Sequence, residues 1–153
     1  MIALSDSPLD IAALLAAVGD DEHGGTALFV GTTRREADSA AVDALVYEAY
    51  EELALAEMAA VAAEAEAAWG ARVAVAHRVG AVAVGEPSVI VAASAGHRPA
   101  AFAACRQVID ELKARVPVWK QSVHPGGDAR WIDGRDAPRA APTPDPAGRP
   151  HAG

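Results

Sequence analysis

The sequence predicts an α+β fold, in which about three helices cover a mostly antiparallel sheet. Runs of strong helix formers are separated by short apolar segments rich in β-branched residues, which is the pattern of helices placed between strands. The 153 residues are enough for one domain with a packed core and few for two, and 52% of them are hydrophobic. A mixed α/β arrangement of the same elements stays open at this point.

Residues that favour helix starts and helix ends mark the limits of the first two predicted helices. The first helix follows Ser7 and Pro8, with the proline in its first turn. The second helix covers 51–69 and stops at Gly70, because glycine suits the left-handed position that ends many helices.

The third predicted helix begins near Pro99 and ends near Arg115, because Pro117 cannot donate the backbone hydrogen bond that a helix requires. Its apolar residues recur on one face, which predicts a stripe packed against the core. That stripe comprises Phe102, Cys105, Ile109 and Leu112. On this face the cysteine is expected to be a small buried hydrophobe rather than a nucleophile.

Apolar segments bounded by glycine, proline or charged residues predict the strands. They cover 24–34, 42–50, 72–80 and 88–95, with a further short strand at "RWID" (130–133). From Gly134 onward proline, alanine, glycine and arginine dominate, and large apolar residues are nearly absent. We therefore predict one domain over 1–133 and a flexible tail over 134–153.

The formal net charge of −8 argues against a general nucleic-acid-binding protein, which needs a basic surface to neutralise phosphates. The charge is unevenly spread along the chain. Residues 97–120 carry five basic residues and two acidic ones, a local charge of +3. Such a segment is either a local anion site or a solvated helix face.

Neither a secretory signal nor a membrane span is predicted. The N-terminus carries Asp6 and Asp10 and no basic residue, and no uninterrupted apolar run reaches the ~18 residues that a bilayer requires. The single cysteine, Cys105, cannot form an internal disulfide. We therefore expect a cytoplasmic protein in a reducing compartment.

His97 and Arg98 stand directly before Pro99, at the start of the third predicted helix. Unpaired backbone N–H groups and the positive end of the helix dipole favour anions there. The guanidinium adds a planar pair of donors suited to phosphate, and the imidazole can donate a further hydrogen bond. The alternative is a helix start that is basic without binding an anion.

Lys113 and Lys120, on either side of Pro117, are the only lysines among the 13 basic residues. If the chain turns at the proline so that both enter one hollow, each ammonium group lowers the pKa of the other. Such a lysine can serve as acid, base or covalent amine, whereas a guanidinium stays protonated. The alternative is that both lysines lie here by chance, and position alone does not decide between the two.

The segment "FVGTTRR" (29–35) ends a predicted strand with Thr32, Thr33 and Arg34, where ligand-facing and merely exposed arginines are equally common. The five histidines are scattered, without HxxxH or CxxC spacing, so no metal site is predicted. No P-loop, GxGxxG or GxSxG motif occurs. We expect neither a metal nor another cofactor.

Three segments together resemble the large, catalytic subunit of molybdopterin synthase: "LFVGTTR", "LVYEAYEELALAEM" and the run that ends in "GHRPAAFAACRQVIDELKARVPVWK". The resemblance follows the family's order over 24–131. It implies a hammerhead-like single catalytic domain and a homodimer, each half binding a small ubiquitin-like sulfur carrier to give a heterotetramer. The carrier's C-terminal Gly-Gly thiocarboxylate would supply sulfur, twice, to cyclic pyranopterin monophosphate. The product would be the dithiolene of molybdopterin, made for molybdenum cofactor biosynthesis.

Carried over residue by residue, the resemblance makes Lys113 and Lys120 the catalytic pair, with Lys113 the essential member. His97 and Arg98 would reach the substrate's phosphate largely from the neighbouring subunit. The implied substrate-binding residues are Thr32, Thr33, Arg34, His97, Arg98, Lys113, Lys120, Gln121 and Ser122.

The chain departs from the family's pattern in two places. Relatives often follow the second lysine with a basic residue and a glutamate, where this chain has Gln121 and Ser122, and many have asparagine in place of Arg35. If that glutamate orients a lysine, Ser122 must do so differently. The alternative function is a non-catalytic module of the same fold that binds a phosphate ligand or the carrier without turnover.

Overall fold

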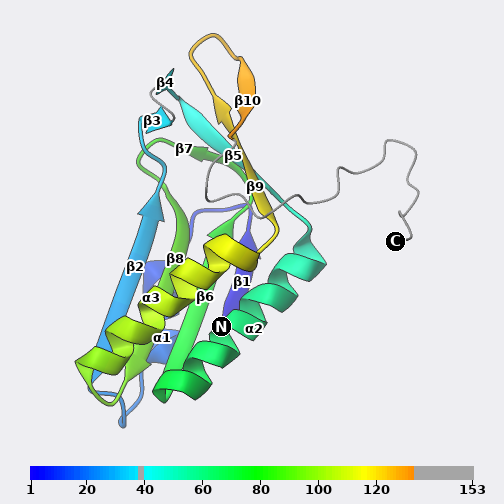
Figure 1. The fold of residues 1–153 in the computed structure, drawn as a ribbon. Helices are drawn as coiled ribbons and strands as arrows, with labels where there is room; N and C mark the ends of the chain where they lie inside the picture. The colour runs from blue at the N-terminus through cyan, green and yellow to red at the C-terminus, as the bar shows by residue number, and fades with distance from the viewer. Residues whose placement is uncertain (38–39, 133–153) are drawn as a thin grey trace, which may run out of the picture.

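A computed structural model describes residues 1–37 and 40–132 of the chain (Figure 1). In this part of the chain three helices accompany two four-stranded sheets and a two-stranded hairpin. The predicted tail, 134–153, lies outside the described residues. The described elements agree with the predicted α+β class.

The first sheet has the strand order β1-β6-β8-β2. Its strands are β1 (Ile2–Ser5), β6 (Ala71–Arg78), β8 (Pro87–Ala95) and β2 (Gly25–Thr32). β1 runs parallel to β6, whereas β6 and β2 both pair antiparallel with β8. The sheet is therefore mostly antiparallel, as predicted.

The second sheet has the order β10-β9-β5-β7, and all its pairs are antiparallel. Its strands are β10 (Ala129–Trp131), β9 (Val118–Val123), β5 (Ala44–Ala49) and β7 (Gly80–Ala83). The hairpin pairs β3 (Glu36–Ala37) with β4 (Ala40–Ala41). Figure 1 shows the second sheet at the upper end of the first, next to this hairpin.

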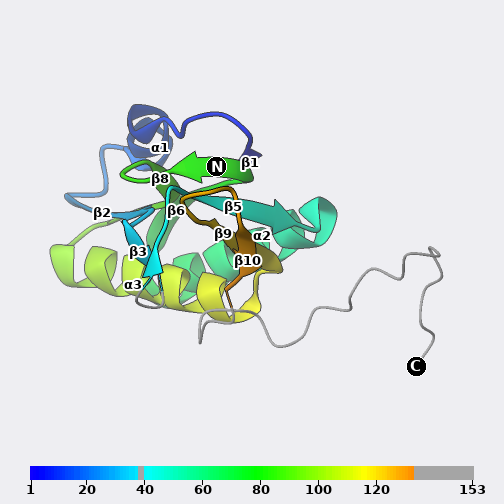
Figure 2. The ribbon, with the colours of Figure 1, turned by 90° about the horizontal axis from the view of Figure 1, so that it is seen from above.

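The helices lie on both faces of the first sheet (Figure 2). They are α1 (Ile11–Val18), α2 (Glu51–Trp69) and α3 (Arg98–Arg115). Alternate side chains of β8 divide the core: Val91 packs with α2 and α3, while Ile90 packs with α1. None of the helices in the described residues is long and apolar enough to cross a membrane.

The first turn of α1 differs from the prediction. The helix begins at Ile11 rather than at Pro8, because the carboxylate of Asp10 accepts a hydrogen bond from the backbone N–H of Ala13 at 3.1 Å. Asp10 is therefore the N-cap. The end of α2 was predicted correctly, since Gly70 adopts the left-handed conformation with φ of 57°.

The buried face of α3 was predicted correctly except at Phe102, which is 64% exposed. Small residues at Ala101 and Ala104 bring the helix close to the sheet, so the buried face is centred on them and Phe102 lies outside it. Cys105 is buried, as predicted, with its thiol 3.7 Å from the carbonyl oxygen of Val91. Burial also raises the pKa of this thiol, which makes it a poor nucleophile.

Candidate functional site

Lys120 lies on β9 directly opposite Tyr47 of β5. Opposed residues of an antiparallel pair point to the same face of the sheet, with Cβ atoms about 5 Å apart. Both side chains are partly buried. The strand pairing therefore places a tyrosine beside the second of the two predicted catalytic lysines.

The ring of Tyr47 reaches from the second sheet to the first. It meets the ring of His77 edge-on, with centroids 5.1 Å apart and planes at 75°. Burial raises the pKa of the Tyr47 phenol, and the nearby hydroxyls of Ser88 and Thr33 act in the opposite direction with a smaller effect. The phenol is thus a neutral group, close to Ser88 and to Thr33, the residue before Arg34.

Thr33 is fixed at the end of β2 by its backbone. Its N–H donates to the carbonyl of Glu86 at 3.0 Å, and its own carbonyl accepts from the N–H of Gly85 at 2.8 Å. Thr33 is only 2% exposed, whereas the next residue, Arg34, is exposed. The turn between β7 and β8 therefore fixes the backbone of Thr33, the residue directly before the exposed Arg34.

Lys113 is exposed in the last turn of α3. In the same turn Arg115 donates to the carboxylate of Glu64 at 2.7 Å and to that of Glu57 at 3.2 Å, which ties the end of α3 to α2. The helix ends at Arg115, and β9 begins directly after the buried Pro117. The predicted end of the helix is confirmed. Pro117 connects α3, which carries Lys113, to β9, which carries Lys120.

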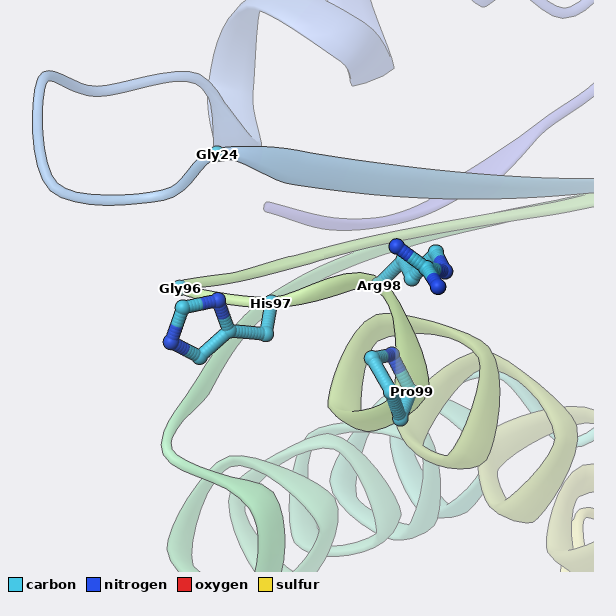
Figure 3. Close-up of a pocket in the computed structure, with 5 residues that line it drawn as sticks. All are labelled: Gly24, Gly96, His97, Arg98 and Pro99. Atoms are coloured by element: carbon cyan, nitrogen blue, oxygen red, sulfur yellow. The ribbon is translucent and has the colours of Figure 1, made fainter.

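His97 and Arg98 lie at the opposite end of α3, beside a hollow of about 460 Å³. The hollow is lined by Gly24, Gly96, His97, Arg98 and Pro99 (Figure 3). The two side chains leave the backbone in different directions, and neither caps the helix. This is the helix start that the sequence predicts.

Close packing of β2 against that helix start requires a glycine. A Cβ atom on Gly25 would lie 3.0 Å from the backbone nitrogen of Arg98. The first residues of the strand therefore lie directly against the N-terminal turn of α3.

Within one chain the two groups of predicted residues are far apart. Arg98 and Lys113 are 15 residues apart on one helix, so they are separated by about 22 Å along its axis. The structure places Lys120 opposite Tyr47 on the neighbouring strand, but it does not bring His97 or Arg98 to the lysines.

Ser122 and Gln121 follow Lys120 on β9 and point to opposite faces. Ser122 is buried, and its hydroxyl lies 2.8 Å from His124 Nε2 and donates to the carbonyl of Arg130 at 3.2 Å. His124 Nδ1 is 2.8 Å from the carbonyl of Ala41 and donates to it. The serine and the histidine thus join β4, β9 and β10.

No cluster of three or more histidine, cysteine, aspartate or glutamate side chains within 1–37 and 40–132 could hold a metal ion.

A family model described as "MoaE protein" matches residues 4–115. The chain belongs to the MoaE family. The matched region includes the end of β2 and all of α3, while Lys120 lies just beyond its last residue. The resemblance inferred from sequence segments is therefore confirmed.

Individual relatives of this MoaE-family chain agree with that assignment. The molybdopterin synthase catalytic subunit of Oryza sativa subsp. indica is 46% identical over 153 residues, covering 95% of this chain and 79% of that protein. The protein of the same name from Drosophila willistoni is 40% identical over 141 residues, covering 90% of this chain. The chain spans only 38% of the length of that Drosophila relative.

A solved structure agrees with the fold. The molybdopterin biosynthesis MoaE protein of Burkholderia ambifaria superposes with a TM-score of 0.74 and 35% sequence identity, over 95% of this chain and 92% of that one. The predicted fold class is therefore confirmed by a relative of nearly equal extent.

Sequence reasoning did not single out Tyr47, His77 or His124, which lie next to the candidate residues or to one another. Tyr47 belongs to the predicted strand 42–50, and His77 to the predicted strand 72–80, but nothing in those segments indicates that the two strands meet. The only available signal for His124 was its position two residues after Ser122, which places both side chains on one face of a strand.

Proposed function

We propose that this chain is the catalytic subunit of a molybdopterin synthase, a sulfurtransferase that moves sulfur from a thiocarboxylated carrier protein to cyclic pyranopterin monophosphate. The observation that carries the proposal is the backbone connection between the segment after Arg34 and the strand of Lys120, in a chain of the MoaE family: Val42 N–H donates to the carbonyl of Arg35, and Asp43 N–H donates to the carbonyl of Val123 on β9. The relatives named molybdopterin synthase catalytic subunit support the same reaction.

Lys113 and Lys120 are the proposed catalytic residues. Lys113 would act as acid, base or covalent amine during opening of the cyclic phosphate and attack by sulfur. Lys120, on the neighbouring strand, would hold the anionic carrier tail or the phosphate. The exposed Arg34, with Thr32 and Thr33 before it, would bind the substrate from the other side of Tyr47.

The phosphate contacts of His97 and Arg98 would come from a second copy of the chain. The separation of about 22 Å along α3 is too large for one small substrate to touch both ends of the same helix. A homodimer that places the start of one α3 beside the lysines of its neighbour removes this difficulty. Each site of such a dimer would then combine residues of two chains.

The carrier is proposed to be a small ubiquitin-like protein with a C-terminal Gly-Gly thiocarboxylate. Two carriers and two copies of this chain would form a heterotetramer in the cytoplasm. Gln121 and Ser122 would line the site beside Lys120, with the serine hydroxyl held by His124 as described.

The decisive experiment combines the purified chain, the thiocarboxylated carrier and cyclic pyranopterin monophosphate, and measures molybdopterin. Formation of the dithiolene product supports the proposal. Binding of carrier and substrate without product would favour the non-catalytic module of the same fold. The Lys113→Arg variant separates these cases, because a binding module needs only the charge, whereas a catalytic lysine does not tolerate the guanidinium.

A further inference from the structure

We infer that Arg115 is a positioning residue that fixes the last turn of α3 and thereby directs Lys113 toward the substrate. The inference rests on the proposed sulfur transfer, in which Lys113 is the essential residue. Arg115 itself is not proposed to touch the substrate. It acts through α2, the helix that lies beside α3 (Figures 1 and 2).

The guanidinium of Arg115 contacts carboxylates with all three of its nitrogen atoms. Nε and Nη2 each donate to Oε2 of Glu57 at 3.2 Å, and Nη1 donates to Oε2 of Glu64 at 2.7 Å. Nη1 also lies 3.6 Å from Oε2 of Glu111, about one turn earlier on α3. A planar guanidinium shared among several carboxylates is held more firmly than a single exposed ion pair. This side chain therefore fixes the end of α3 with respect to α2.

The last turn of α3 needs such an anchor, because the helix cannot continue beyond it. The backbone N–H of Val116 donates to the carbonyl of Leu112 at 3.0 Å, and Pro117 has no N–H that could extend the series. Helix ends open more easily than helix interiors, because their backbone makes fewer hydrogen bonds. The contacts of Arg115 with α2 oppose this opening in the turn that carries Lys113.

Helix geometry sets the direction of Lys113 once Arg115 is held. Residues two positions apart on a helix project about 200° apart around its axis. Arg115 projects toward α2, since Glu57 and Glu64 belong to that helix. Lys113 therefore projects away from α2, and a rotation of the last turn would move its side chain sideways.

The anchor lies where both helices join the second sheet. β5 ends at Ala49, just before α2, and β9 begins at Val118, just after α3. These two residues are opposite each other in the antiparallel pair. Backbone pairing therefore holds the strands on one side of the two junctions, and Arg115 holds the helices on the other. Because Lys113 precedes the junction of α3 with β9 and Lys120 follows it, these contacts fix the separation of the two lysines.

An effect of charge is the alternative to positioning, and the partners of Arg115 distinguish the two. If the guanidinium acted by attracting the anionic substrate, its removal should weaken binding, whereas removal of the charges of Glu57 and Glu64 should strengthen it. If Arg115 acts by holding α3, both changes should impair catalysis alike, because each breaks the same contact. A misplaced catalytic group lowers the rate of the chemical step.

The test measures kcat and KM for cyclic pyranopterin monophosphate in the complete synthase of this chain and its carrier. We expect Arg115→Met, and separately the double variant Glu57→Gln with Glu64→Gln, to lower kcat by roughly tenfold or more while KM changes by less than about twofold. Gln107→Ala is the matched control and should keep the wild-type kcat. It removes another hydrogen bond between the two helices, the one donated by Trp69 Nε1 at 2.7 Å, but lies about two turns from Arg115.

Combining the substitutions separates one shared contact from independent effects. Arg115→Met with both glutamine substitutions should lower kcat little more than either change alone. A wild-type kcat in Arg115→Met would overturn the inference, as would a glutamine double variant that differs from wild type only by a lower KM. If Arg115→Met does not fold, the glutamine double variant alone decides the matter. If wild-type protein makes no molybdopterin, the proposed function fails; if it turns over while both variants keep its kcat, only the role of Arg115 fails.

Discussion

Arg98 and Lys113 occupy the first and last turns of one helix, about 22 Å apart along its axis. Both belong to the substrate-binding residues implied by the family resemblance. One small substrate cannot contact both residues of the same chain. The proposed site is therefore complete only where two copies of the chain meet.

Complementation between two inactive variants tests this arrangement. Lys113→Ala and Arg98→Ala should each reduce molybdopterin formation strongly. When the two variants are co-expressed, part of the activity should return, because mixed dimers contain one site with neither substitution. A mixture of Lys113→Ala with Lys120→Ala is the matched control and should regain no activity. Both lysines of a site come from the same chain, so every site of the mixed dimer still carries one substitution. Absence of recovery in demonstrated mixed dimers would contradict the two-chain site.

The contact between Ser122 and His124 should stabilise the second sheet. His124→Ala removes the hydrogen bond to the exposed carbonyl of Ala41 and leaves the Ser122 hydroxyl with the carbonyl of Arg130 alone, which we expect to lower the free energy of unfolding by about 0.5–1.5 kcal/mol. Ser122→Ala should cost a similar amount. Denaturant unfolding of the single and double variants checks the coupling, because partners in one network give less than additive losses. Additive losses would mean that the two side chains act separately.

Burial lowers the pKa of His77 below its ordinary value of 6.5. The unfolded chain therefore binds a proton below pH 6.5 that the folded chain resists, so stability is complete above this pH and falls as the pH decreases. The slope from this one group reaches at most about 1.4 kcal/mol per pH unit. Urea unfolding between pH 7.5 and pH 5 should show the loss, and His77→Gln should flatten the slope. An unchanged slope in the variant would assign the effect to other groups.

Gly31 should tolerate no side chain, because a Cβ atom there would lie 2.7 Å from Cγ1 of Val89. We expect Gly31→Ala to lower the free energy of unfolding by about 1–3 kcal/mol through overpacking next to Thr32. Val89→Ala in the same chain should restore part of the loss, since it removes the clashing methyl group. Thermal unfolding of the three variants provides the measurement. A stable Gly31→Ala protein would show that the strand has room to shift.

The sequence was sufficient for the elements whose ends carry a local signal. Gly70 and Pro117 ended their helices as predicted, and the long apolar segments formed the central strands. The start of α1 was wrong because a carboxylate at Asp10 competes with the proline signal at Pro8. Strand β9 was missed because "VWKQSV" mixes apolar and polar residues, and its pairing with β5 decides its conformation.

The site was predicted as a set of residue types but not as an arrangement. The use of lysine rather than arginine on either side of Pro117 indicated these two residues, and the family resemblance supplied their roles. The place of Tyr47 between Lys120 and Thr33 depends on contacts between residues 14 and 73 positions apart in the chain. No pattern within one segment reports such a contact, so it had to come from the fold.

The central claim is that Lys113 is the essential residue for sulfur transfer in this chain. Molybdopterin formation by Lys113→Ala, in the presence of thiocarboxylated carrier and cyclic pyranopterin monophosphate, tests it most directly. We expect the variant to fold and bind the carrier but to form no detectable product, while Lys120→Ala retains reduced activity. Product formation by Lys113→Ala at the wild-type rate would contradict the claim.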